Sequence, residues 1–140
     1  MKRPILTSYQ CVIGFSDFAT GLLLMATPQF TLRMMGLHAP EDALPYLSFI
    51  GAFVFSVGIA CLYGAYIASC DGWTRTLATV WLLTTVTRAT VALFVTGNVL
   101  TGALAVGWMT VAIMDAGCAV LQTIGLRRGW LNNAATSASK

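Results

Sequence analysis

The chain is 140 residues long; 57% of its residues are hydrophobic and only 9% are charged, with a formal net charge of +3. A water-soluble domain normally carries about 25% charged residues. The composition therefore excludes an ordinary soluble domain and leaves no room for a soluble catalytic module. It predicts one integral membrane domain over residues 1–131, followed by a flexible polar C-terminal tail over residues 132–140.

Four apolar stretches are long enough to cross a bilayer as helices, since a hydrocarbon core about 30 Å thick needs about 20 helical residues. They cover residues 5–27, 47–69, 77–95 and 101–126. Residues that interrupt helices separate them, at Pro28, at Pro45, in a turn at 70–72 and in a turn at 96–98. Because the last two connections are short, consecutive helices must be antiparallel neighbours. The predicted fold is an all-α, antiparallel four-helix membrane bundle.

The longest connection, between the first two stretches, predicts a short interfacial helix on the outer face. Pro28 suits a helix start and Gly36 a helix end. His38, Glu41 and Asp42 follow, and they form only a weak candidate for a metal or proton site. Two acidic residues in a row are what a helix N-terminus prefers electrostatically, so helix capping is the favoured interpretation.

The Lys and Arg residues predict the orientation, because cytoplasmic loops carry an excess of them. If both termini are cytoplasmic, only Arg33 lies outside, and the inner residues are Lys2, Arg3, Arg75, Arg127, Arg128 and Lys140. This topology accounts for the net charge, so we expect no nucleic-acid partner. A secretory signal peptide is the competing interpretation of the N-terminus, but Asp17 in the middle of the apolar run favours a retained helix.

Three charged residues, Asp17, Arg88 and Asp115, lie inside separate apolar stretches. A charge at the centre of a bilayer costs about 2.5–3.5 kcal/mol, so such residues persist where they pair or have a function. Counted from the nearest inner-face arginine at about 1.5 Å per residue, their depths are about 21, 20 and 18 Å. The three therefore share one layer, and we expect Arg88 to lie within hydrogen-bonding range of Asp17 or Asp115.

Polar and small residues continue the helix faces that carry these charges, because residues three, four or seven apart share a face. They are Gln10, Gly14, Thr20 and Gly21 in the first stretch, Trp81, Thr84 and Thr85 in the third, and Trp108 and Gln122 in the fourth. Two interpretations stay open. The layer is either a buried ion pair that fixes helix register, or a polar cavity that binds a small molecule or relays protons.

The second stretch carries a ladder of small residues at four-residue spacing, which we call the small-residue ladder. Its members are Ala52, Ser56, Ala60, Gly64 and Ala68. Small residues let helix backbones approach closely in lipid, so the ladder marks a helix-packing face. An internal contact is favoured over a contact with another subunit.

Neither a metal site nor a catalytic residue is expected. The four cysteines, Cys11, Cys61, Cys70 and Cys118, lack metal-ligand spacing, and His38 is the single histidine. We interpret the thiols as small buried or interfacial groups. No conventional enzyme motif is present, so enzymatic activity is not favoured.

The order of these features resembles a known group of proteins. In chain order, the features are a first helix that ends in Pro-x-Phe-x-x-Arg-x-x-Gly-Leu (28–37), a small-residue second helix, Arg88, a Gly-Asn pair and Asp115. Over residues 9–125, the chain thereby resembles small bacterial four-helix membrane proteins related to DoxX. The resemblance implies the bacterial cytoplasmic membrane and a link to membrane redox systems, including quinone-linked sulfur oxidation.

The favoured function is that of a non-catalytic accessory subunit that docks on a larger membrane complex, with the bilayer and other membrane subunits as partners. The alternative is a protein that binds quinone or another small hydrophobic ligand, or relays protons, through a polar midplane cavity. No cofactor is evident from the residues; a quinone or a lipid would be the ligand of the alternative. A transporter is less favoured, because the sequence has no broken-helix pair or inverted repeat.

Overall fold

The structure is a computed structural model that describes residues 3–69 and 74–131. Its elements are α1 (Arg3–Ala26), α2 (Pro28–Met34), α3 (Leu44–Ser69), α4 (Thr74–Leu100) and α5 (Met109–Arg127), with 3-10 turns at Glu41–Ala43 and Val106–Trp108. No strand occurs in these two ranges, so the predicted all-α fold is confirmed. The predicted turn at 70–72 and the predicted tail at 132–140 lie outside the described residues.

Four of these helices have the length and hydropathy needed to cross a membrane. The qualifying segments are Pro4–Ala26, Glu41–Ser69, Arg75–Leu100 and Val106–Arg127. Each carries many exposed apolar side chains, as expected where the solvent is lipid. The chain is therefore a helical membrane protein.

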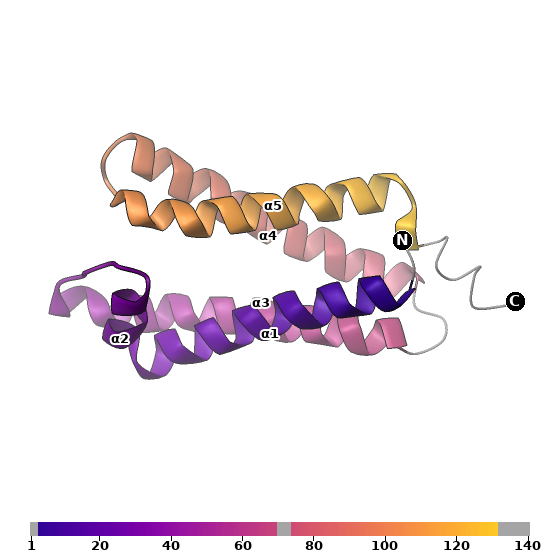
Figure 1. The fold of residues 1–140 in the computed structure, drawn as a ribbon, viewed down its shortest axis with the longest axis horizontal. Coiled ribbons are helices and arrows are strands. Elements are labelled where there is room, and N and C mark those ends of the chain that lie inside the picture. The colour runs from indigo at the N-terminus through magenta and orange to yellow at the C-terminus, as the bar shows by residue number, and fades with distance from the viewer. Residues whose placement is uncertain (1–2, 70–73, 132–140) are drawn as a thin grey trace, which may run out of the picture.

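The four long helices form two pairs, α1 with α3 and α4 with α5 (Figure 1). The start of α1 and the end of α5 lie at one end of the molecule, while α2 lies at the other. The α1–α3 pair packs most extensively, whereas α3 and α4 touch much less. The bundle is therefore tight within each pair and looser between the pairs.

Glycines bring α1 and α3 together. A methyl group placed on Gly14 would lie 2.9 Å from the Leu62 nitrogen, and one placed on Gly51 would lie 2.9 Å from the Gly21 carbonyl oxygen. Contacts this short with backbone leave no space for a side chain. The residues Gly14, Gly21, Gly51 and Gly58 thus form the close interface that small residues provide in membranes.

Two apolar clusters close the ends of the bundle. At the end where α1 begins, the apolar residues Leu6, Ala68, Leu77 and Leu131 pack together and against Trp81. We call these four apolar residues the terminal cluster. At the opposite end, Leu32, Leu37 and Leu47 pack together with Trp108. The polar interior lies between these two clusters.

The predicted turn at 96–98 is wrong, because α4 continues through it to Leu100. A helical glycine costs only about 1 kcal/mol relative to alanine, whereas an unpaired backbone group in lipid costs several. Asn98 also donates its side-chain amide to the Phe94 carbonyl at 2.8 Å. The chain turns instead at Gly102, whose φ is 76°, and α5 begins at Met109 rather than at residue 101.

The connection between α1 and α3 contains the short helix that the sequence predicts. Pro28 occupies the first turn of α2, and Gly36 follows its end with φ 69°. The Leu37 N–H donates to the Leu32 carbonyl at 2.8 Å, which is the backbone arrangement of a glycine-terminated helix. The next long helix, α3, begins at Leu44 with Pro45 in its first turn, three residues before the predicted start.

Candidate functional site

Arg88 lies at the centre of the inward face of α4. The residue is only 4% exposed, although it sits in a helix long enough to span a membrane. The buried positions on this face recur every three or four residues, at 77, 81, 84, 88, 92 and 95. The helix period therefore directs the arginine away from lipid and into the bundle.

The guanidinium group of Arg88 lies between two carboxylates from different helices. Its Nη1 contacts Asp115 Oδ1 of α5 at 2.5 Å, and its Nη2 contacts Asp17 Oδ2 of α1. The two aspartate side chains are 19% and 16% exposed. The predicted proximity of Arg88 to these acids is confirmed for both of them. We call Asp17, Arg88 and Asp115 the charged trio.

The charged trio is unbalanced, because one guanidinium faces two carboxylates. When both acids are ionised, the site carries one uncompensated negative charge in a low-dielectric interior. Two buried thiols, Cys61 and Cys118, lie within electrostatic range of the guanidinium. This neighbourhood is not among the predictions from sequence, although Cys118 is three residues after Asp115 and therefore shares its helix face.

A second polar layer lies two helical turns from the charged trio, toward the terminal cluster. Gln10 precedes Asp17 by seven residues, Trp81 precedes Arg88 by seven, and Gln122 follows Asp115 by seven. All three side chains are 0% exposed. Seven residues are two turns, or about 10.5 Å along a helix. We call Gln10, Trp81 and Gln122 the glutamine layer.

Only part of the glutamine layer is hydrogen-bonded. The Gln122 Oε1 accepts from Thr85 Oγ1 at 3.0 Å and lies 3.4 Å from Thr84 Oγ1. Thr84 also donates to the Val80 carbonyl at 2.8 Å. The Thr85 hydroxyl therefore fixes the oxygen end of the Gln122 amide and leaves its Nε2 directed elsewhere.

Several buried polar atoms near this layer have no hydrogen-bond partner among the residues that the structure describes. They are both amide atoms of Gln10, Nε2 of Gln122, Nε1 of Trp81, Nε of Arg88 and the hydroxyl of Tyr9. Each buried group left unpaired costs about 1–3 kcal/mol. Hydrogen-bond donors outnumber acceptors in this set, so the interior is short of acceptors.

Trp108 does not belong to this site, contrary to the sequence analysis. It lies in the 3-10 turn that precedes α5 and packs against Leu32, Leu37 and Leu47 at the α2 end. The seven-residue spacing from Trp108 to Asp115 predicts a shared face only within one helix. Because α5 begins after Trp108, that spacing does not apply.

The small-residue ladder of α3 contacts both α1 and α4. Gly64 and Ala68 are buried, and a methyl group placed on Gly64 would lie 3.0 Å from Gln10 Nε2 and 3.2 Å from Val80 Cγ1. Ala52 and Ala60 are half-buried, whereas Ser56 is exposed and donates to the Ala52 carbonyl at 2.8 Å. Internal packing thus involves the part of the ladder near the terminal cluster, and the rest is open.

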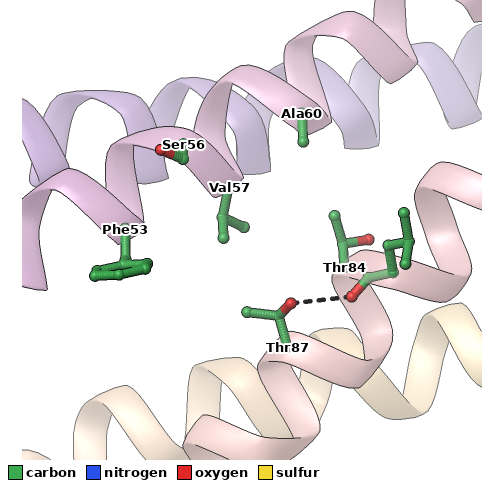
Figure 2. Close-up of a pocket in the computed structure, with 7 residues that line it drawn as sticks. Phe53, Ser56, Val57, Ala60, Thr84 and Thr87 are labelled. Carbon is green, nitrogen blue, oxygen red and sulfur yellow. Dashed lines mark hydrogen bonds between the residues drawn. The ribbon is translucent and has the colours of Figure 1, made fainter.

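The open part of the ladder forms one wall of a groove between α3 and α4, which we call the α3–α4 groove. Figure 2 shows Thr84 and Thr87 of α4 opposite side chains of α3. The groove has a volume of about 250 Å³ and is lined by Phe53, Ser56, Val57, Ala60, Leu83, Thr84 and Thr87. Leu83 and Thr87 are exposed while Thr84 is buried, so the groove leads from the lipid-facing surface toward the interior.

The acidic residues of the α2–α3 connection lie far from this interior in the fold. Glu41 and Asp42 occupy the first turn of the 3-10 helix before α3, and both are exposed, as is His38. Within residues 3–69 and 74–131, no group of three His, Cys, Asp or Glu side chains could hold a metal ion. The polar interior is therefore the candidate site.

Comparison with known proteins adds nothing to this geometry. The chain matches no protein family, no curated protein and no solved structure. The site must therefore be interpreted from its own residues.

Proposed function

We propose that the protein is a small, non-catalytic membrane subunit that docks on a larger membrane complex through the α3–α4 groove. The observation that carries this proposal is the incomplete closure between α3 and α4. Ser56, Ala60 and Thr87 are small or hydroxyl-bearing residues at the open side, and such residues favour helix contacts in lipid. A transmembrane helix of a partner subunit would complete this face.

The proposed location is the bacterial cytoplasmic membrane, with both termini cytoplasmic and α2 on the outer face. The start of α4 carries Arg75, and the end of α5 carries Arg127 and Arg128, whereas Arg33 lies in α2. This asymmetry supports the orientation through the preference of Lys and Arg for cytoplasmic loops. A DoxX-like role beside a membrane electron-transport complex agrees with the resemblance but rests on it alone.

Purification in mild detergent tests the subunit proposal. We expect the protein to elute in a stoichiometric complex, and we expect Ser56→Trp, which fills the groove, to release it as a folded monomer. The matched control is Leu93→Trp, at an exposed position of α4 that does not line the groove. Elution of the unaltered protein as a monomer, or equal complex formation by Ser56→Trp, would contradict the proposal.

A second candidate function is binding of a small hydrophobic ligand, such as a quinone or a lipid, or proton relay through the polar interior. The unpartnered atoms of the glutamine layer favour it, together with the unbalanced charge of the trio. Replacing the trio as Asp17→Asn, Arg88→Met and Asp115→Asn removes all charges at once. If the triple variant folds, assembles and keeps the activity of its host system, the trio has only a structural role.

A further inference from the structure

The glutamine layer is chemically selective in the partner that it accepts. Nε2 of Gln10, Nε2 of Gln122 and Nε1 of Trp81 are donors without acceptors in the part of the chain that the structure describes. A bound group that satisfies them must present hydrogen-bond acceptors. A cation presents none, and Gln10 Oε1 is the one unpartnered acceptor among these three side chains. A bound cation would leave all three donors unsatisfied, so it is a poor ligand for this layer.

The charged trio restricts the partner further. Asp17 and Asp115 outnumber Arg88, so an anion two turns away would meet a net negative charge in a medium of low dielectric. A neutral acceptor avoids this repulsion. Carbonyl oxygens are neutral acceptors with two lone pairs, enough for two of these donors.

Access to the layer is also restricted. The terminal cluster packs between the glutamine layer and the end of the bundle, and its members Leu6 and Leu77 are fully buried. Each lies one helical turn beyond Gln10 or Trp81. An apolar, closely packed plug does not admit polar solutes from that end.

The lining of the α3–α4 groove lies beside the glutamine layer. Thr84 lines the groove and also lies 3.4 Å from Gln122 Oε1. Ala60 lines the groove one turn from Gly64, where a methyl group would lie 3.0 Å from Gln10 Nε2. Gln122 therefore lies directly behind the lining of an apolar groove that opens toward lipid, and Gln10 lies one turn further along α3, beside Gly64.

We infer that the glutamine layer binds the carbonyl oxygen of a neutral, membrane-soluble molecule whose apolar chain lies in the α3–α4 groove. This inference rests on the second candidate function and names its ligand class. Donors at the inner end of the groove fix the carbonyl head, and the apolar walls hold the chain. Two kinds of membrane molecule carry such a carbonyl group, namely acyl esters of glycerol and quinone-type rings.

The test uses Trp81 fluorescence in a full-length variant with Trp73, Trp108 and Trp130 replaced by phenylalanine. The protein is held in an alkyl maltoside, which carries no carbonyl group. The probes are a long-chain methyl ketone, the alkane of equal length and the carboxylate of equal length. We expect saturable binding of the ketone at least about tenfold tighter than that of either analogue, the ratio that about 1.4 kcal/mol gives.

Variants locate the binding site. Gln122→Leu and Gln10→Leu should each weaken ketone binding about tenfold, whereas the matched control Gln29→Leu, at an exposed glutamine of α2, should leave it unchanged. If a leucine variant fails to fold, the unbranched Gln122→Met replaces it. The ketone-to-alkane ratio in the parent protein decides the question without any interior variant.

Equal affinity for ketone and alkane, binding insensitive to both interior glutamines, or no binding at all would overturn the inference. A monoacylglycerol and an alkylated benzoquinone then distinguish the two ligand sources by which binds tighter. Ketone selectivity is measured on the purified protein, without any partner subunit, so its outcome does not depend on whether the subunit proposal is correct. Selective binding by a protein that forms no complex would leave this inference standing while the subunit proposal fails.

Discussion

Arg88 of α4 forms an ion pair with Asp17 of α1 although these two helices are not close neighbours in the bundle. The long arginine side chain crosses the space between the two helix pairs. Its other nitrogen reaches Asp115 on α5 at 2.5 Å, within its own pair. One side chain therefore connects the tight α1–α3 unit to the α4–α5 unit.

We expect Arg88→Met alone to destabilise the protein by about 3–5 kcal/mol, because it leaves two buried carboxylates uncompensated. The triple variant with Asp17→Asn and Asp115→Asn should recover most of this loss, since a neutral set can replace a buried ion pair. Equilibrium unfolding in detergent measures the stability of both variants. If Arg88→Met is as stable as the parent protein, the charged trio does not hold the two helix pairs together.

Glycine substitutions should separate close contacts from open positions. In Gly58→Ala the new methyl group would lie 2.8 Å from the Phe18 Cα atom, and we expect a loss of about 1–3 kcal/mol from overpacking.

Gly117→Ala on α5 is the matched control, because nothing lies within 4 Å of its new methyl group. It should gain up to about 1 kcal/mol from helix propensity. The same unfolding measurement applies, and a Gly58→Ala protein as stable as Gly117→Ala would contradict the close α1–α3 interface.

Gln10→Met should stabilise the ligand-free protein by about 1–3 kcal/mol, because it removes a fully buried amide that has no partner in the described structure. The unbranched methionine side chain fits the space beside Gly64. Thermal unfolding in a carbonyl-free detergent measures the change. Destabilisation would mean that the Gln10 amide is already hydrogen-bonded in solution.

Cysteine labelling tests the proposed orientation in a background without the native cysteines. A membrane-impermeant maleimide should modify Thr101→Cys, in the exposed α4–α5 turn, in intact cells. Arg127→Cys, at the end of α5, should react only after permeabilisation. The reverse pattern would place both termini outside and overturn the orientation.

The charged trio could be predicted from the sequence, because a charged side chain in an apolar membrane helix is stable mainly where it pairs with an opposite charge. Helical rise alone places Asp17, Arg88 and Asp115 at one depth, and the four apolar stretches carry no other charged residue. The same reasoning failed at residues 96–98, where a Gly-Asn pair is a good turn signal in water. In an apolar helix the backbone hydrogen bonds outweigh that signal, and the turn moves to Gly102.

The partner of each helix face could not be predicted from spacing. Both the small-residue ladder and the pair Gly51 and Gly58 present small residues on α3. Which of them meets α1 depends on the rotation of α3 about its axis, and that rotation is set by all its neighbours together. The groove at Ser56 and Ala60 follows from the same rotation, so it also has no signature in one helix.

The ion pair between Asp17 and Arg88 joins residues 71 positions apart in the chain. At about 5–20 residues per second, a ribosome takes roughly 4 to 14 s to make that interval. If α1 enters the membrane as it is made, Asp17 arrives there before Arg88. Because α1 and α3 precede α4 and α5 in the chain, a newly made chain would then hold an unpaired acid near Gly14 and Gly21 until its second half arrives.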